Sequence, residues 1–238
     1  MVLIIAAINF LSAFVQAASG FGYAIFAMFL MPMFLPFQQC SVISAAVIVI
    51  IATQMMFSLY KHIGIKKIII PMFFCLLTTW LGIWIIHVTD EVIMRKIMGV
   101  FLILLAIYFY LTKKYGVVIK QTFFSGMIIG VFTGITTGMF NIVGPFLALY
   151  YYDNCKDNVE FKANIECSFF IAGLFSLILN LTYTKLDSFL VSTIITSGIA
   201  AVLAGVIGLK IFYRINRETL KYIIISILPL MGIIQLLK

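Results

Sequence analysis

Long apolar runs make up most of the chain, and the polar stretches between them are short. A helix that crosses a bilayer needs about 20 apolar residues, and most of these runs reach that length. The predicted helical segments are 2–18, 22–35, 38–60, 67–87, 91–112, 121–137, 142–152, 159–183, 187–209 and 215–237. Segments 22–35 and 142–152 are short for a full crossing at a rise of about 1.5 Å per residue.

Two of the runs are interrupted by glycine and small polar residues. Residues 16–23 read Gln-Ala-Ala-Ser-Gly-Phe-Gly-Tyr, and residues 136–145 read Thr-Thr-Gly-Met-Phe-Asn-Ile-Val-Gly-Pro. Irregular backbone at membrane depth is tolerated only where protein buries it or where it lines a cavity. Corresponding interruptions in two halves of a chain point to the binding site of a transporter. The pattern therefore predicts a transporter whose site lies at the two breaks.

Composition agrees with this interpretation. The chain is 64% hydrophobic and 10% charged, whereas a soluble domain carries roughly 25% charged residues. We expect an all-α polytopic membrane helix bundle with eight to ten membrane segments and no soluble domain. The net charge of +8 lies mostly in loops, where it sets orientation rather than indicating a nucleic-acid partner. The four cysteines (Cys40, Cys75, Cys155 and Cys167) show no metal-binding or disulfide pattern, and no cofactor is expected.

The positive charges predict the topology. Three loops are basic, and their charged residues are Lys61, Lys66, Lys67, Lys113, Lys114, Lys120, Lys210, Arg214, Arg217 and Lys221. All three loops fall on one side, the cytoplasmic side, only if segments 121–137 and 142–152 form a hairpin rather than a single crossing. Each half, 1–116 and 117–238, is then a hairpin followed by three crossings, so the halves are inverted repeats and both termini lie outside.

One stretch carries basic residues on the outer side in this topology. Arg95 and Lys96 follow Glu91 closely. At such spacing an acidic residue supports a helix, so we place both basic residues inside the start of segment 91–112.

The two breaks provide candidate chemistry for an anion. A helix that begins in mid-membrane presents unsatisfied N–H groups and a partial positive charge, which binds an oxyanion without a fixed cation. The candidate binding residues are Ser19, Gly20, Gly22, Tyr23, Thr137, Gly138, Asn141, Gly144 and Pro145. The alternative is that small residues serve close helix packing, which we expect of the evenly spaced Gly126, Gly130, Gly134 and Gly138.

Glu166 is the acidic residue deepest in a predicted span. An intramembrane carboxylate is a functional candidate, and its protonation would fit proton coupling. The alternative is a structural pair with Lys162, four residues earlier, near the membrane surface. Gln16, Gln54 and Asn164 are candidates for a polar pathway, with hydrogen bonding between helices as the alternative.

At these motifs the chain resembles the sulfite exporter TauE/SafE family. Residues 19–28 (Ser-Gly-Phe-Gly-Tyr-Ala-Ile-Phe-Ala-Met) are similar to the family pattern SGFGxGLxAVP, and residues 138–147 resemble GLFGxGGPPL. Asn141 and Val143 stand where the family usually has glycine. Residues 159–163 resemble EEFRA, and residues 95–100 resemble the R-x-x-x-G start of the helix that closes the first half.

The resemblance implies transport of small anions, notably sulfite or sulfonates, coupled to an ion gradient. A channel for small solutes is the alternative, because it can use the same broken helices. An enzyme is not expected, because the sequence shows no catalytic motif. The expected partners are a small anionic substrate and the lipid bilayer, and the expected location is the cell membrane of a prokaryote. The oligomeric state is left open, a homo-oligomer being one option.

Overall fold

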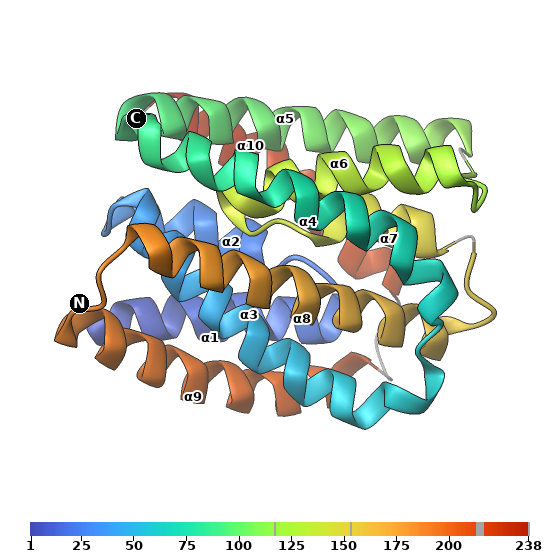
Figure 1. Ribbon diagram of the computed structural model, residues 1–238, viewed down its shortest axis with the longest axis horizontal. Helices are drawn as coiled ribbons and strands as arrows, with labels where there is room; N and C mark the ends of the chain where they lie inside the picture. The colour runs from blue at the N-terminus through green and yellow to red at the C-terminus, as the bar shows by residue number, and fades with distance from the viewer. Residues whose placement is uncertain (117, 153, 213–216, 238) are drawn as a thin grey trace.

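The computed structural model describes residues 1–116, 118–152, 154–212 and 217–237, and in them the predicted segments are helices (Figure 1). The α-helices are α1 (Val2–Ser19), α2 (Tyr23–Leu30), α3 (Phe37–Leu59), α4 (Ile65–Val88), α5 (Glu91–Tyr115), α6 (Phe123–Phe140), α7 (Gly144–Tyr152), α8 (Asn158–Tyr183), α9 (Ser188–Phe212) and α10 (Arg217–Leu237), with 3-10 turns at Met31–Met33 and Tyr60–His62. Within the described residues, seven helices are long and apolar enough to cross a membrane. The predicted all-α polytopic membrane fold is confirmed.

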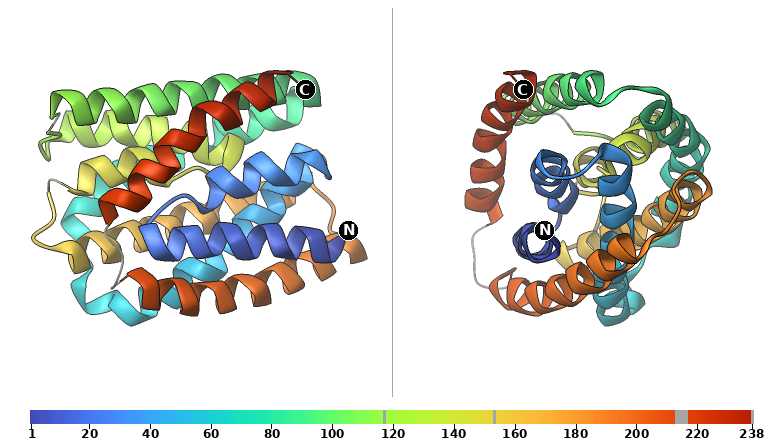
Figure 2. Two further views of the ribbon diagram at one scale, coloured as in Figure 1. Left: turned by 180° about the vertical axis from the view of Figure 1, so that it is seen from behind. Right: turned by 90° about the vertical axis from the view of Figure 1, so that its left-hand side faces the viewer.

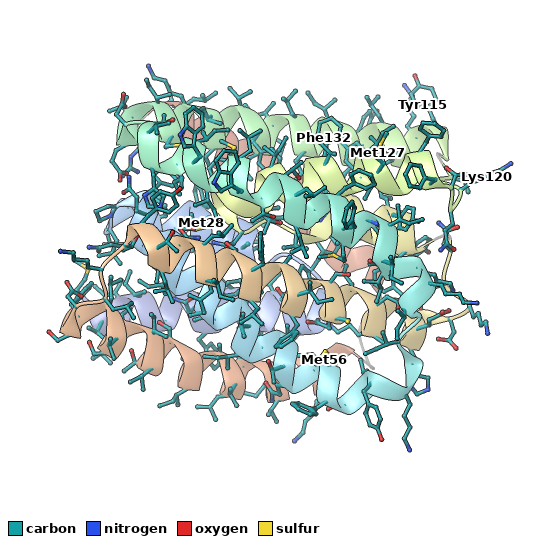
Figure 3. The ribbon with its side chains drawn as sticks, in the orientation of Figure 1. Met28, Met56, Tyr115, Lys120, Met127 and Phe132 are labelled. Carbon is teal, nitrogen blue, oxygen red and sulfur yellow. The ribbon has the colours of Figure 1, made fainter. Side chains whose placement is uncertain are left out.

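The two broken helices enter the molecule from opposite ends. In Figure 1, α1 runs inward from the end that holds both termini and α2 turns back toward it, while α6 and α7 make the same hairpin from the other end. The connections from α3 to α4 and from α5 to α6 lie at that other end, where Figure 3 labels Lys120. Of the predicted cytoplasmic charges, Arg214 and the side chains of Lys113, Arg217 and Lys221 lie outside the described part of the chain.

Helix pairing is similar in the two halves. α1 packs on α9 as α6 packs on α4, α3 packs on α9 as α8 packs on α4, and the α3–α8 and α5–α10 pairs join the halves. In this correspondence α1 matches α6, α3 matches α8, α4 matches α9 and α5 matches α10, so each pair of helices has a counterpart. A Cβ added at Gly99 would lie 2.8 Å from the Gly232 carbonyl, and one at Gly232 would lie 2.7 Å from the Gly99 carbonyl. This reciprocity supports the predicted inverted repeats, which remain a prediction.

The glycine stripe of α6 lies against α4. A Cβ added at Gly126 would come within 2.8 Å of Ile70 Cγ2, and one at Gly138 would come within 2.7 Å of Gly82 Cα. Small residues let two backbones approach closely in a membrane, where dispersion contacts stabilise helix pairs. The stripe therefore packs helices, and Gly138 belongs to this interface.

The outer helices carry apolar side chains on their exposed faces. Viewed from the end with both termini, α4, α5, α9 and α10 lie at the periphery, around α1 and α2 (Figure 2). Phe73 on α4, Leu104 on α5 and Ile199 on α9 are more than half exposed, as expected of side chains that contact lipid. The broken helices are thus held inside the bundle.

Arg95, near the start of α5, has a structural partner. The Arg95 guanidinium donates a hydrogen bond to the Pro32 carbonyl, and the Glu91 carboxylate accepts one from the Phe37 N–H at 2.9 Å. Arg95 and Glu91 both lie in the first turns of α5, as predicted, and both fasten the turn between α2 and α3.

Candidate functional site

The first break is made by two glycines. Gly20 has φ +94° and Gly22 has φ +115°, a backbone region that costs other residues free energy. The Gly20 N–H donates to the Gln16 carbonyl at 2.8 Å, which closes the end of α1. Ser19 Oγ lies 2.7 Å from the Val15 carbonyl and 2.5 Å from the Phe21 carbonyl. Its hydroxyl therefore joins the two sides of the turn.

The second break lies later than the sequence predicted. α6 continues to Phe140, so Thr137 and Gly138 are helical, and the left-handed residue is Asn141 with φ 53°. Asn is among the few residues besides glycine that tolerate this conformation, which is why the turn falls there. The predicted helix end at residue 137 is wrong for this reason. It also explains how Asn141 replaces the glycine usual in the family pattern.

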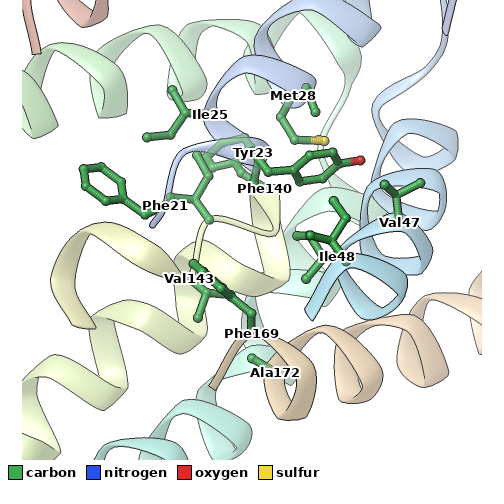
Figure 4. Close-up of a cluster of buried hydrophobic side chains, with 14 of the residues drawn as sticks. Phe21, Tyr23, Ile25, Met28, Val47, Ile48, Phe140, Val143, Phe169 and Ala172 are labelled. Carbon is green, nitrogen blue, oxygen red and sulfur yellow. The ribbon is translucent and has the colours of Figure 1, made fainter. Parts of the chain in front are cut away.

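The two breaks contact each other in the middle of the bundle. A Cβ added at Gly144 would lie 2.7 Å from Phe21 Cβ. Figure 4 shows Phe21 and Tyr23 of the first break above Val143 of the second, near Ile48 of α3 and Phe169 of α8. A small cavity lies between them, lined by Gln16, Gly22, Ala24, Ile25, Ile48, Asn141, Ile142, Val143, Gly144, Pro145 and Phe169. It offers water about 10 Å³, roughly the space of one molecule.

The walls of this cavity suit a negative charge. The first residues of α2 and of α7 line it, and a helix N-terminus carries unpaired N–H groups and about half a positive charge. The Gln16 and Asn141 side chains also line the cavity, where the Gln16 amide faces Glu166 and the Asn141 amide is hydrogen-bonded to Ser41 and Ser176. Among the described residues, no three His, Cys, Asp or Glu side chains group closely enough to hold a metal ion.

Five predicted residues meet at the cavity, namely Gln16, Gly22, Asn141, Gly144 and Pro145. Other predicted residues make contacts elsewhere. The Tyr23 hydroxyl donates to Asn9 Oδ1, and the Thr137 hydroxyl donates to the Thr133 carbonyl at 2.6 Å.

The two remaining pathway candidates also lie away from the cavity. Gln54 sits at the α3–α9 interface, where a Cβ added at Gly205 would lie 2.7 Å from its Oε1. Asn164 Oδ1 accepts a hydrogen bond from the Gly64 N–H at 2.6 Å, so it fastens the α3–α4 connection to α8. Both side chains therefore lie against neighbouring segments and outside the cavity lining.

Two serines that the sequence analysis did not single out hold the second break. Asn141 Nδ2 donates to the Ser41 carbonyl at 3.0 Å, and the Ser176 hydroxyl donates to Asn141 Oδ1 at 2.7 Å. Asn180 Nδ2 in turn donates to the Ser176 carbonyl at 2.9 Å. The spacing of Ser176 and Asn180, four residues apart in an apolar helix, was a signal of this polar row.

Glu166 forms an ion pair with Lys162, which the sequence analysis gave as the alternative to a proton-coupling role. Lys162 Nζ lies 2.8 Å from Glu166 Oε1, and the two side chains are 1% and 0% exposed. Gln16 Nε2 lies 3.4 Å from Glu166 Oε2. The pair is therefore buried inside the bundle, beside the first break.

Paired broken helices inside a bundle of membrane-spanning helices are a design of secondary transporters, and fold and site together define a multi-pass membrane protein of this architecture. Residues 5–234 match the family described as sulfite exporter TauE/SafE. The chain belongs to this family, whose members are membrane transporters rather than enzymes. Neither the comparison with curated proteins nor that with solved structures finds a match.

Proposed function

We propose that this transporter carries a small sulfur-containing anion such as sulfite or a sulfonate, bound between the two helix breaks. The observation that carries the proposal is the cavity onto which the N-terminal residues of both α2 and α7 open. Two helix N-termini stabilise an oxyanion through N–H groups and partial charge. The family description of sulfite exporters supports the same substrate class.

The size of the cavity favours a transporter over a channel. A space for roughly one water molecule between the breaks is too small for sulfite. An anion enters such a site only if the breaks move apart toward one side of the membrane, and alternating access is movement of this kind.

Coupling to protons is part of the proposal, with Glu166 as the proton acceptor. The carboxylate is buried and lies one hydrogen bond away from Gln16 on the cavity wall. A proton taken up there would offset the charge of the arriving anion in a medium where charge is costly.

Flux in proteoliposomes tests this function. Sulfite, sulfate, thiosulfate and sulfonates are offered at imposed pH gradients, and saturable flux of at least one of them, driven by the gradient, is expected. Failure of every anion to move or to compete would refute the substrate class. Flux that never saturates and is accompanied by single-channel currents would identify a channel instead.

Labelling tests the inverted repeats that bring the two breaks together. In a variant without the native cysteines, Lys61→Cys and Asp187→Cys place thiols on exposed residues of the two halves. An impermeant maleimide should reach position 187 from outside and position 61 from the cytoplasm only, with Lys120→Cys behaving as position 61 does. Labelling of 61 and 187 from the same side would contradict the proposed topology.

A further inference from the structure

The ion pair of α8 is buried at a point where a charge is costly. Lys162 and Glu166 are 1% and 0% exposed and lie in a candidate membrane span. Replacing a buried pair by apolar residues is often neutral or stabilising, so such a pair is weak evidence for a purely structural role. Charged side chains within a membrane segment mark substrate and ion pathways. This pair therefore calls for a functional explanation.

The pair is joined to the wall of the cavity through a single residue. Lys162 Nζ donates to the Gln16 carbonyl at 3.3 Å, the same carbonyl that accepts the Gly20 N–H at the first break. Glu166 Oε2 faces the Gln16 side-chain amide, and Gln16 lines the cavity together with Asn141. The first break, the ion pair and the cavity thus share Gln16.

The contact between Gln16 and Glu166 is long for a hydrogen bond. At 3.4 Å between Nε2 and Oε2 it lies beyond the usual 2.7–3.2 Å range and is weak. A rotation of the Gln16 side chain away from Glu166 breaks only this weak contact, and Gln16 is the residue that the cavity lining and the ion pair share. Such a rotation would extend the cavity toward the ion pair.

A full positive charge changes what the site can bind. Two helix N-termini supply about half a charge each, whereas sulfite and related anions carry one or two full charges. An ammonium group paired with a carboxylate of the protein keeps the empty site neutral. When an arriving anion replaces that carboxylate, the ammonium group pairs with the anion instead.

We propose that Lys162 is the fixed cation of the anion site and that Glu166 is its counterion when the site is empty. This inference rests on the proposed function. In the loaded state the substrate anion takes the place of Glu166 beside Lys162, and the Gln16 side chain rotates so that the cavity reaches Lys162. Glu166 thus competes with the substrate for the same ammonium group.

Binding by a set of charge variants tests the exchange. Sulfite-induced thermal stabilisation of the purified protein in detergent reports affinity for Glu166→Gln, Lys162→Gln, the double variant and Lys162→Arg. Removing the competitor in Glu166→Gln should tighten binding at least about tenfold, and removing the cation in Lys162→Gln should weaken it by about tenfold or more. The double variant should fall between the two, and Lys162→Arg should bind within about threefold of the wild type because it keeps the cation.

The chain offers a matched control pair. Lys67 and Glu160 lie 2.7 Å apart with side chains 17% and 13% exposed, near the start of α8 but away from the cavity lining. Lys67→Gln and Glu160→Gln should leave sulfite affinity unchanged. Gel filtration of every variant reports folding. If one of the single variants does not fold, the sulfite affinities of Lys162→Arg and of the double variant still show whether the positive charge at position 162 is needed for binding.

The outcomes distinguish the inference from the proposed function. Saturable sulfite flux in the wild type, with Lys162→Gln and Glu166→Gln weakening binding alike and the double variant restoring it, would show a structural pair and overturn the inference alone. No binding and no flux of any sulfur oxyanion by the wild type would overturn the proposed function. Opposite effects of the two single variants would establish the exchange.

Discussion

The two helix breaks meet at one cavity but are held in different ways. In the second break, the Asn141 side chain is hydrogen-bonded to Ser41 on α3 and to Ser176 on α8, so two other helices fix it. The first break takes its shape from Gly20 and Gly22, and its hydrogen bonds to α8 are long: 3.3 Å from Lys162 Nζ to the Gln16 carbonyl and 3.4 Å from Gln16 Nε2 to Glu166 Oε2.

The difference assigns the breaks different parts in transport. A turn made by glycines, with a weak side-chain connection, changes shape at low cost, whereas a turn anchored by buried hydrogen bonds does not. The second break is therefore expected to be the fixed wall of the site, and the first break the wall that moves to admit the anion.

The largest expected effect is at the contact between the breaks. Gly144→Leu places a side chain where an added Cβ would already lie 2.7 Å from Phe21 Cβ. Transport should fall below about one hundredth of the wild type, which corresponds to a loss of about 2.7 kcal/mol in the transition state, while the protein remains monodisperse. The matched control is Gly198→Leu, whose Cβ would meet only the flexible end of Ile50. Normal flux in Gly144→Leu would show that the second break is not part of the site.

An intermediate effect is expected at the left-handed residue of the second break. Asn141→Gly removes the hydrogen bonds to Ser41 and Ser176 but keeps a residue suited to φ 53°. Asn141→Ala loses the same bonds and adds about 1 kcal/mol of backbone strain. The melting temperature should therefore fall in the order wild type, glycine variant, alanine variant. An alanine variant as stable as the glycine variant would mean that the conformation at this position is not what selects Asn.

The smallest expected effects concern the hydroxyl groups that close each turn. Thr136 Oγ1 lies 2.7 Å from the Ile142 carbonyl across the second break, as Ser19 Oγ lies near the Phe21 carbonyl across the first. Thr136→Val and Ser19→Ala should each cost about 1 kcal/mol or less, measured as a small fall in melting temperature. Only Ser19→Ala should also change the rate of transport, because its turn is the one expected to move. Equal effects on transport would remove the distinction between a fixed and a moving break.

The sequence predicted the helices well because apolar runs of spanning length are a local signal. It also offered the i, i+4 pair of Lys162 and Glu166 as the alternative to a proton-coupling role, because that pair depends on one helix only. The anchoring of Asn141 by Ser41 and Ser176 depends on helices far apart in the chain, so no local pattern reveals it. The end of α6 was misplaced because Gly138 is the stronger local signal for a break, although close packing on α4 keeps that residue helical.

A double-mutant cycle across the cavity measures most directly whether the breaks form one site. The variants are Gln16→Ala, Asn141→Gly and their combination, and the readout is sulfite affinity. If both breaks hold the same anion, the two changes should be non-additive by about 0.5 kcal/mol or more, whereas Gln16→Ala combined with Gln54→Ala, away from the cavity, should be additive. Additivity of Gln16→Ala and Asn141→Gly would contradict the single shared site.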